Sequence, residues 1–123
     1  MTINITGKVI KGDGYGKVLG FPTANLDRRE YGKKKLKIKF GVWVGTARVS
    51  SATYKAGIVI GPLDNSKLPK IEAHLIGFKG NLYGKKITIT LQKYLRPFKK
   101  YKSIEVLKSA IQKDITNIKK MPL

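Results

Sequence analysis

The chain has 123 residues, 26 basic and 7 acidic side chains, a formal net charge of +19 and no cysteine. This length predicts one domain, residues 1–123, and the lack of cysteine excludes zinc ribbons, disulfide frameworks and thiol catalysis. No apolar run approaches the roughly 18 residues that span a bilayer, and the N-terminal segment is too short and polar for a signal peptide. We therefore expect a soluble, cytoplasmic protein with no membrane partner.

The charge taken by itself indicates a polyanionic partner such as nucleic acid. However, recognition of bases and phosphates favours the bidentate guanidinium, and most of the basic residues are lysines spread over every segment. We therefore expect nucleic acid to bind only non-specifically, if at all. The arginines are Arg28, Arg29, Arg48 and Arg96.

Short segments rich in Val, Ile, Thr and Tyr, separated by Gly, Pro and Asn, predict a mainly β fold, an antiparallel barrel or sandwich. The stretch 28–39 has little periodicity and contains three consecutive lysines, so we interpret it as a mobile surface loop. The segment 80–84, Gly-Asn-Leu-Tyr-Gly, predicts a hairpin between the last two strands. The predicted strands are 5–10, 41–49, 53–60, 70–78 and 86–94.

After residue 101 the apolar period becomes helical. Ser103 is the predicted N-cap, and Glu105 lies in the first turn, where a carboxylate interacts favourably with the helix dipole. We expect the apolar face to close one side of the barrel. Its members, at three- and four-residue spacing, are Ile104, Leu107, Ile111, Ile115 and Ile118.

The stretch 12–25 carries most of the candidate chemistry. Its glycines allow backbone amides to approach an anion closely and to adopt positive φ, as in phosphate-binding loops. A plain hairpin loop is the alternative, but a dinucleotide-binding fingerprint is excluded because no helix follows and no βαβ unit surrounds it. The four glycines are Gly12, Gly14, Gly16 and Gly20.

Behind the rigid Pro22, Thr23 and Asn25 stand two positions apart, so in extended backbone they lie on the same side. Neutral oxygen ligands of this kind, completed by water and phosphate oxygens, suit Mg²⁺ bound together with a nucleotide. A capped turn is the alternative interpretation, because Thr and Asn both favour such positions.

In the predicted strand 70–78, Glu72 and His74 lie on one face, and the apolar residues that alternate with them lie on the other. Glu72 is one of only seven acidic residues and is a candidate general base. The alternative is a solvent-facing carboxylate paired with a neighbouring lysine. His74 has no other metal ligands nearby in the sequence and is interpreted as structural.

Taken together, these motifs resemble the sequence pattern of the riboflavin kinase (flavokinase) family. They occur in the same order and extend over nearly the whole chain. The family pattern Leu-Gly-Phe-Pro-Thr-Ala-Asn is matched at 19–25, and Gly-Val-Trp at 41–43. Glu-x-His-Leu follows at 72–75 and Phe-x-Gly-x-Leu-Tyr-Gly at 78–84. Leu95, Arg96 and a closing helix with Asp114 complete the pattern.

The resemblance implies a six-stranded antiparallel Greek-key β-barrel with a C-terminal α-helix. It implies transfer of the γ-phosphoryl group of ATP to the ribityl 5′-hydroxyl of riboflavin, which yields FMN and ADP, with Glu72 as catalytic base and Mg²⁺ or another divalent cation at Thr23 and Asn25. We expect a monomer. The implied nucleotide-binding residues are Gly12, Gly14, Gly16, Lys17, Gly20, Pro22, Thr23 and Asn25. The implied flavin-binding residues are Arg96, Phe98, Tyr101 and Leu107.

Three positions depart from the family pattern. The stretch 59–65 replaces the usual Asn-Ile-Gly and Pro-Thr-Phe loop, Phe98 stands where a glutamate is common, and Lys17 replaces an arginine. Two rivals stay open: a basic barrel that binds RNA or DNA, suggested by the net charge, and a flavin-binding barrel that has lost activity, suggested by Phe98 and the altered loop. ATP is the expected donor, because the CTP-using archaeal flavokinases lack the Pro-Thr-Ala-Asn sequence.

Overall fold

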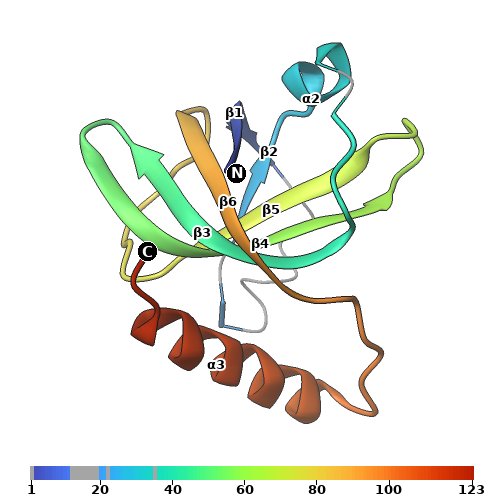
Figure 1. Ribbon diagram of the computed structural model, residues 1–123, viewed down its shortest axis with the longest axis vertical. Helices are drawn as coiled ribbons and strands as arrows, with labels where there is room; N and C mark the ends of the chain where they lie inside the picture. Colours follow the sequence, from blue (N-terminus) through green and yellow to red (C-terminus); the bar gives the residue numbers. More distant parts are fainter. Residues whose placement is uncertain (1, 12–19, 22, 35) are drawn as a thin grey trace.

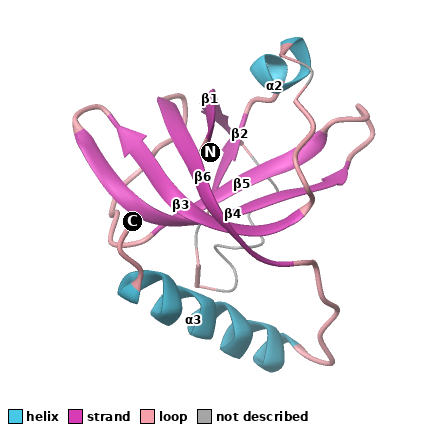
Figure 2. Cartoon of the chain, viewed as in Figure 1, coloured by secondary structure: helices cyan, strands magenta, loops and turns pink. Residues whose placement is uncertain are grey.

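The computed structural model describes residues 2–11, 20–21, 23–34 and 36–123, and it shows a β-barrel with a helix lying across one end (Figure 1). The strands are β1 (Ile3–Ile10), β2 (Ala24–Leu26), β3 (Gly41–Val49), β4 (Ala52–Leu63), β5 (Pro69–Leu75) and β6 (Lys86–Arg96). The helices are α2 (Arg29–Lys33) and α3 (Ile104–Lys120), and Figure 2 shows how strands dominate the chain. The expected six-stranded barrel with a C-terminal helix is confirmed.

The strands follow the order β1-β2-β5-β4-β3-β6 around a closed barrel, and neighbouring strands are antiparallel. The barrel closes where β1 pairs with β6, from Ile3 opposite Leu91 to Lys8 opposite Lys86. The short β2 lies between β1 and β5. Closure of this kind removes the unpaired edges that an open sheet would expose.

The hairpin predicted between the last two strands is wrong. β5 pairs with β2 and β4, whereas β6 pairs with β1 and β3, so the chain crosses the end of the barrel between them. The turn residues serve this longer connection: Asn81 Oδ1 accepts from Tyr83 N at 2.8 Å, and Gly84 N donates to Val9 O at 2.8 Å. Turn chemistry identifies where the chain reverses, but not which strands it joins.

Two short elements lie outside the predicted set. β2 has three residues, too few for a period to be visible, and α2 lies within the stretch 28–39 that was interpreted as a mobile surface loop. A single helical turn has little intrinsic stability, and this one has no side-chain N-cap. Tyr31 stabilises it by burying its ring in the core, where it is 6% exposed.

The core fills the barrel interior with alternate residues of the strands. Among the described residues, no polar or charged side chain is fully buried. In β5 the alternation predicted from the sequence is present, with Glu72 and His74 half-buried on the outer face. The polar side chains that the structure describes therefore lie on the outside of the barrel. The largest fully buried side chains are Leu26, Val44, Ile58, Ile60, Ile71, Ile87, Ile89, Leu91 and Ile118.

Helix α3 confirms the predicted C-terminal helix and its cap, because Ser103 Oγ accepts from Val106 N at 3.2 Å. Only its C-terminal half packs closely on the barrel. Ile118 is 1% exposed and reaches Gly57 of β4, where an added Cβ would lie 3.4 Å from Ile118 Cδ1. By contrast, Ile104 in the first turn is 52% exposed.

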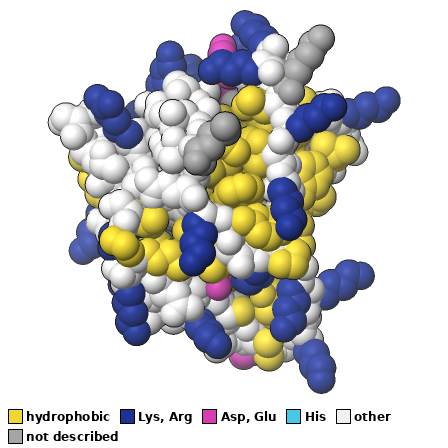
Figure 3. All heavy atoms as spheres, in the orientation of Figure 1, with side chains coloured by type: hydrophobic (Ala, Val, Ile, Leu, Met, Phe, Trp, Pro, Cys, Tyr) yellow, Lys and Arg dark blue, Asp and Glu magenta, His cyan; other side chains and the backbone are white. Residues whose placement is uncertain are grey.

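One face of the molecule carries its basic side chains in a dispersed pattern (Figure 3). On the face shown in Figure 3, Lys and Arg side chains lie around the whole outline instead of forming one stripe. A nucleic-acid-binding face usually gathers such charges along one track. Across the described residues, neither helix combines the length and the apolar character that crossing a bilayer requires.

Candidate active site

A cleft of about 170 Å³ on the outer wall of the barrel contains both Asn25 and Glu72. The two residues are direct cross-strand partners in the pairing of β2 with β5, and Ile10 of β1 pairs with Asn25 on the other side. Directly opposed side chains in an antiparallel pair have Cβ atoms about 5 Å apart. The carboxamide and the carboxylate, predicted separately from the sequence, can therefore contact one ligand.

Thr23 and His74 lie on the same wall. Burial alternates from Thr23 to Leu26, so Thr23 shares the outer side with Asn25. The ring of Phe21 packs edge-to-face against His74, with centroids 6.2 Å apart and an interplanar angle of 86°. This contact holds the segment before β2 against β5, which agrees with the structural interpretation of His74.

A row of paired residues extends from this cleft across the barrel wall. Glu72 pairs with Val59 of β4, Val59 with Val42 of β3, and Val42 with Arg96 of β6. All four side chains are half-buried. Three strand spacings separate Glu72 from Arg96, about 14 Å along the wall. Two valines thus form an apolar floor between the carboxylate and the guanidinium.

Arg96 is fixed in place by α3. Its Nη2 donates to Asp114 Oδ2 at 2.7 Å, and its Nε lies 3.3 Å from the same oxygen. The guanidinium carbon lies 5.9 Å from the centroid of the Tyr101 ring. The hydrogen bond to Asp114 raises the pKa of Arg96 above its ordinary value. Arg96 therefore joins the end of β6, the following connection and the helix.

The other predicted flavin-binding residues lie close by in the chain. Phe98 is 45% exposed and Leu107 is half-buried, and the neighbouring Ile104 and Val106 are also exposed. The first half of α3 and the connection before it therefore present apolar surface to solvent. Such a surface suits an aromatic ligand, because burial of apolar area drives binding.

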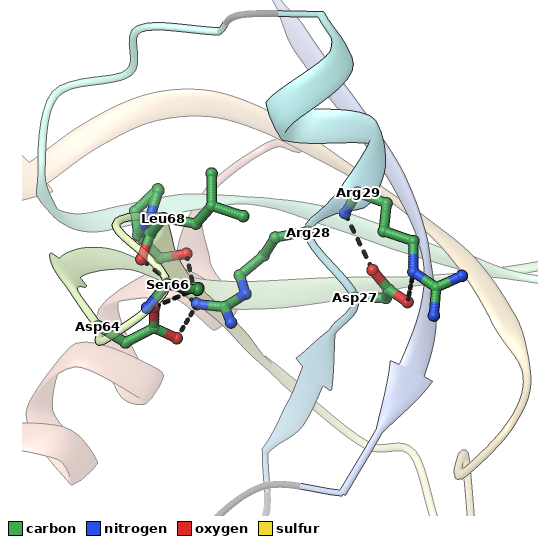
Figure 4. A network of polar contacts seen from close by, with 7 residues as sticks. Asp27, Arg28, Arg29, Asp64, Ser66 and Leu68 are labelled. Carbon is green, nitrogen blue, oxygen red and sulfur yellow. Dashed lines mark hydrogen bonds and ion pairs between the residues drawn. The ribbon is translucent and has the colours of Figure 1, made fainter.

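Arg28 and Asp64 line the same cleft as Asn25 and Glu72, and neither was predicted as a site residue. Their side chains form an ion pair, drawn in Figure 4. Arg28 Nη1 also donates to the carbonyl oxygens of Leu68 and Pro69, each at 3.3 Å. The pair therefore joins the segment after β2 to the β4–β5 turn.

Asp64 is stabilised as a carboxylate by its own turn. Its Oδ1 accepts from Ser66 N at 2.9 Å and from Ser66 Oγ at 2.6 Å. These hydrogen bonds, with that of Arg28, lower the pKa of Asp64 to about 2. No local sequence signal marks either partner, because the pairing depends on two loops that are distant in the chain.

Part of the predicted nucleotide site cannot be compared with the structure, because Gly12, Gly14, Gly16, Lys17 and Pro22 lie outside the described residues. Gly20 is described and has φ of +87°, a conformation that favours glycine. Of the predicted nucleotide-binding residues, Gly20, Thr23 and Asn25 are therefore the ones that the structure describes.

The candidate oxygen ligands, Asn25 in the cleft and Thr23 two positions before it, fit a nucleotide-bound cation better than an all-protein metal centre. In the described part of the chain, no group of three or more His, Asp or Glu side chains could hold a metal. Mg²⁺ in phosphoryl-transfer sites is bound through one or two protein oxygens together with substrate phosphates and water. The Asn25 carboxamide and the Thr23 hydroxyl match this requirement.

A larger cavity, of about 580 Å³, lies between the connection after α2 and the β4–β5 turn. Its walls are mainly apolar, with Lys37, Lys39 and Lys67 among them, and no residue predicted as a site residue lines it. The smaller cleft is the candidate site, because it combines a carboxylate with a carboxamide.

A family model described as flavokinase, riboflavin kinase, matches residues 1–122. The chain belongs to the riboflavin kinase family. Mouse riboflavin kinase is 37% identical over 119 residues, which cover 93% of this chain and 77% of the mouse protein. The bifunctional riboflavin kinase/FMN adenylyltransferase of Mycoplasma pneumoniae is 33% identical over 114 residues, which cover 93% of this chain and 40% of that protein.

The fold also resembles that of a solved riboflavin kinase. The crystal structure of riboflavin kinase from Trypanosoma brucei superposes with a TM-score of 0.73 at 22% identity, covering 96% of this chain and 75% of that one. The chain thus spans about three quarters of the mouse protein and less than half of the Mycoplasma protein. The sequence matches support riboflavin kinase function, and the structural match supports the barrel fold.

Proposed function

We propose that residues 1–123 act as one riboflavin kinase domain that transfers the γ-phosphoryl group of ATP to the ribityl 5′-hydroxyl of riboflavin. The observation that carries this proposal is the pairing of Asn25 with Glu72 in one cleft of a chain from this family. The products are FMN and ADP. A monomer suffices for this arrangement, because the proposed groups all come from one chain.

Glu72 is the proposed base. The ribityl oxygen forms a bond to the γ-phosphorus, the bond from that phosphorus to the bridging oxygen breaks, and ADP leaves with the electron pair. The hydroxyl proton passes to the Glu72 carboxylate. Because phosphoryl transfer depends mainly on positioning and charge stabilisation, the carboxylate acts chiefly by orienting the hydroxyl. Its place on a paired strand restricts its movement.

Thr23 and Asn25 are the proposed protein ligands of the divalent cation. When bound, Mg²⁺ neutralises charge on the phosphate oxygens. Asn25 lies directly across from Glu72. The donor phosphates held on the Asn25 side therefore face the hydroxyl oriented on the Glu72 side.

Arg96, Phe98, Tyr101 and Leu107 are the proposed flavin side of the site. The row through Val59 and Val42 supplies an apolar floor that leads from Glu72 toward Arg96. The exposed first half of α3 supplies a second apolar surface. An isoalloxazine ring placed between them would direct its ribityl chain toward Glu72.

Replacement of Glu72 by Gln tests the proposal. General-base assistance contributes about 10²- to 10⁴-fold, so turnover of riboflavin, ATP and Mg²⁺ to FMN, followed by chromatography, should fall by that order while riboflavin affinity changes little. Glu30→Gln is the matched control, because Glu30 is an exposed carboxylate on α2. Near-normal turnover in Glu72→Gln would remove Glu72 from the mechanism.

The same assay separates the rival functions. A wild-type protein that binds riboflavin but forms no FMN would be an inactive flavin-binding barrel. A protein that forms no FMN but holds a short RNA with sequence preference at physiological salt would be a nucleic-acid-binding barrel. Formation of FMN by the wild type rejects the first rival and removes the reason for the second.

A further inference from the structure

Arg28 is held at the edge of the candidate cleft in a defined orientation. Its side chain is 18% exposed, and it lines the cleft together with Asn25, Glu72 and its own partner Asp64. Two loops fix its position, since it follows β2 and binds the β4–β5 turn. An arginine fixed in this way loses less conformational freedom on binding a ligand than a mobile one does.

The contacts of Arg28 occupy only one part of its guanidinium. The ion pair to Asp64 and both hydrogen bonds to carbonyl oxygens pass through Nη1. A guanidinium has five N–H donors, and within the described residues no contact is assigned to its Nε or Nη2. That edge has the fork geometry that binds a phosphate through two parallel hydrogen bonds.

The charges around Arg28 also favour an anion. The cleft contains Lys11 and Lys70 in addition to Arg28, against the carboxylates of Asp64 and Glu72. Asp64 is committed to its own turn by two hydrogen bonds from Ser66. The Asp64 carboxylate therefore orients Arg28 and leaves the Nε and Nη2 donors of that arginine for a ligand.

We propose that Arg28 binds the phosphate chain of the nucleotide donor through its Nε and Nη2 edge, and that Asp64 sets the direction of this edge. The inference rests on the proposed function, since it assigns the donor phosphates to the cleft that contains Asn25 and Glu72. It adds a donor-binding residue outside the glycine loop and outside the Pro22 to Asn25 segment. Asp64 acts through Arg28 and is a positioning residue.

The test compares Arg28→Met with Arg29→Met. Arg29 is the neighbouring arginine, its side chain is 85% exposed, and it pairs with Asp27, so its replacement makes the same change in net charge. Arg28→Met should weaken ATP binding by about tenfold or more, because the loss of even one of the two charge-assisted hydrogen bonds of the fork costs about tenfold, with riboflavin affinity within about twofold of wild type. Arg29→Met should leave both affinities close to wild type.

Calorimetric titration with ATP, and competition by inorganic tripolyphosphate, measure donor binding without requiring turnover. Arg28→Met should weaken the binding of tripolyphosphate by about the same factor as the binding of ATP, because the proposed contact is to phosphate alone. Arg28→Lys retains the charge but lacks the fork, so it should recover only part of the affinity. Asp64→Asn should lower the affinity for ATP less than Arg28→Met does.

A purely structural role gives a different pattern. If Arg28 only joins the two loops, Arg28→Met would lower the melting temperature and leave ATP and tripolyphosphate affinity unchanged in the folded protein, which would overturn the proposal. If Arg28→Met does not fold, the Arg28→Lys variant provides the test. An ATP affinity equal to that of the wild type in Arg28→Lys would contradict binding of phosphate through the Nε and Nη2 edge. A wild type that makes no FMN would reject the proposed function, whereas the titrations would still test Arg28.

Discussion

Two of the arginine–aspartate pairs in the described part of the chain join segments that are distant in the sequence, and they join different structures. Arg28 and Asp64 connect two loops at the cleft, whereas Arg96 and Asp114 connect the last strand to α3. Arg28 makes its contacts through one nitrogen, while Arg96 directs both Nε and Nη2 at Asp114. The Arg96 pair therefore mainly maintains the architecture, and the Arg28 pair keeps donors available for a ligand.

The difference follows from how each carboxylate is held. Asp64 already accepts two hydrogen bonds from Ser66, so it supports its turn independently of the arginine. For Asp114, the hydrogen bonds that the structure gives come from Arg96. Removing Arg96 should therefore destabilise the protein more than removing Arg28. Four measurements test the roles of the two pairs and of the surrounding charge.

The largest expected effect is that of Arg96→Met, which leaves a half-buried Asp114 without its partner and removes the ion pair between β6 and α3. We expect the free energy of unfolding, from urea titration, to fall by about 2–3 kcal/mol, below the range for fully buried pairs because both side chains retain some exposure. Arg48→Met is the control, since Arg48 is exposed and its Nε donates to Ser50 O of the neighbouring turn. Equal stability of the two variants would contradict an architectural role.

Asp114→Asn should have the next largest effect, because it retains the shape of the side chain but removes its charge. The expected loss is about 1.5–2 kcal/mol, at the low end of the range for hydrogen bonds to charged groups. The Michaelis constant for riboflavin should rise more than that for ATP, since Arg96 lies on the proposed flavin side. Asp27→Asn, which affects a pair with an exposed Arg29, serves as control. An equal rise in the Michaelis constants for riboflavin and ATP would instead indicate a general destabilisation of the barrel.

Ionic strength should separate the two substrates by a smaller amount. The net charge of +19 attracts ATP over long range, and salt screens this attraction beyond about 10 Å at 0.1 M. The apparent affinity for ATP should therefore fall as sodium chloride rises, whereas that for neutral riboflavin should stay nearly constant. The slope for ATP should be shallower in Arg28→Met than in Arg96→Met. Parallel slopes for both substrates would show that the charge does not act on the nucleotide.

The smallest effect is expected from acid titration of the Asp64 pair. The pKa of Asp64 in the folded protein is about 2, below its ordinary value of 3.8. The ionised carboxylate therefore contributes stability above pH 3.8, and this contribution is lost as the pH falls toward 2. Since Asp64→Asn lacks the titrating group, its urea midpoint should approach that of the wild type across this interval. A constant difference across the interval would show that the carboxylate charge contributes nothing to stability.

Much of the fold could be predicted because its signals are local. The alternation of Ile71, Glu72 and Ala73 marks a half-buried strand, and the spacing of Ile115 and Ile118 marks one face of a helix. The partners of each strand could not be predicted in the same way. β2 is too short to show a period, and the turn at 80–84 leads across the barrel and not into a hairpin.

The site could be predicted in part for a related reason. Glu72 and Asn25 stand out by their chemistry and by the family motifs, but their direct opposition depends on the register between β2 and β5. Arg28 and Asp64 have no such signal, because an arginine after a strand and an aspartate in a turn are ordinary surface residues. Only the packing of two loops brings them to the same cleft.

The closure of the barrel by β1 and β6 also bears on how the protein is made. Thr6 and Thr88 hydrogen-bond at 2.9 Å although they are 82 positions apart. A strand synthesised early must therefore wait for one synthesised late, and contacts of such long sequence separation form slowly. During translation β1 exposes an unpaired edge until β6 has left the ribosome, which is the period of greatest risk of aggregation. Arg96 ends β6 and α3 follows it, so a nascent chain acquires the proposed flavin side of the site last.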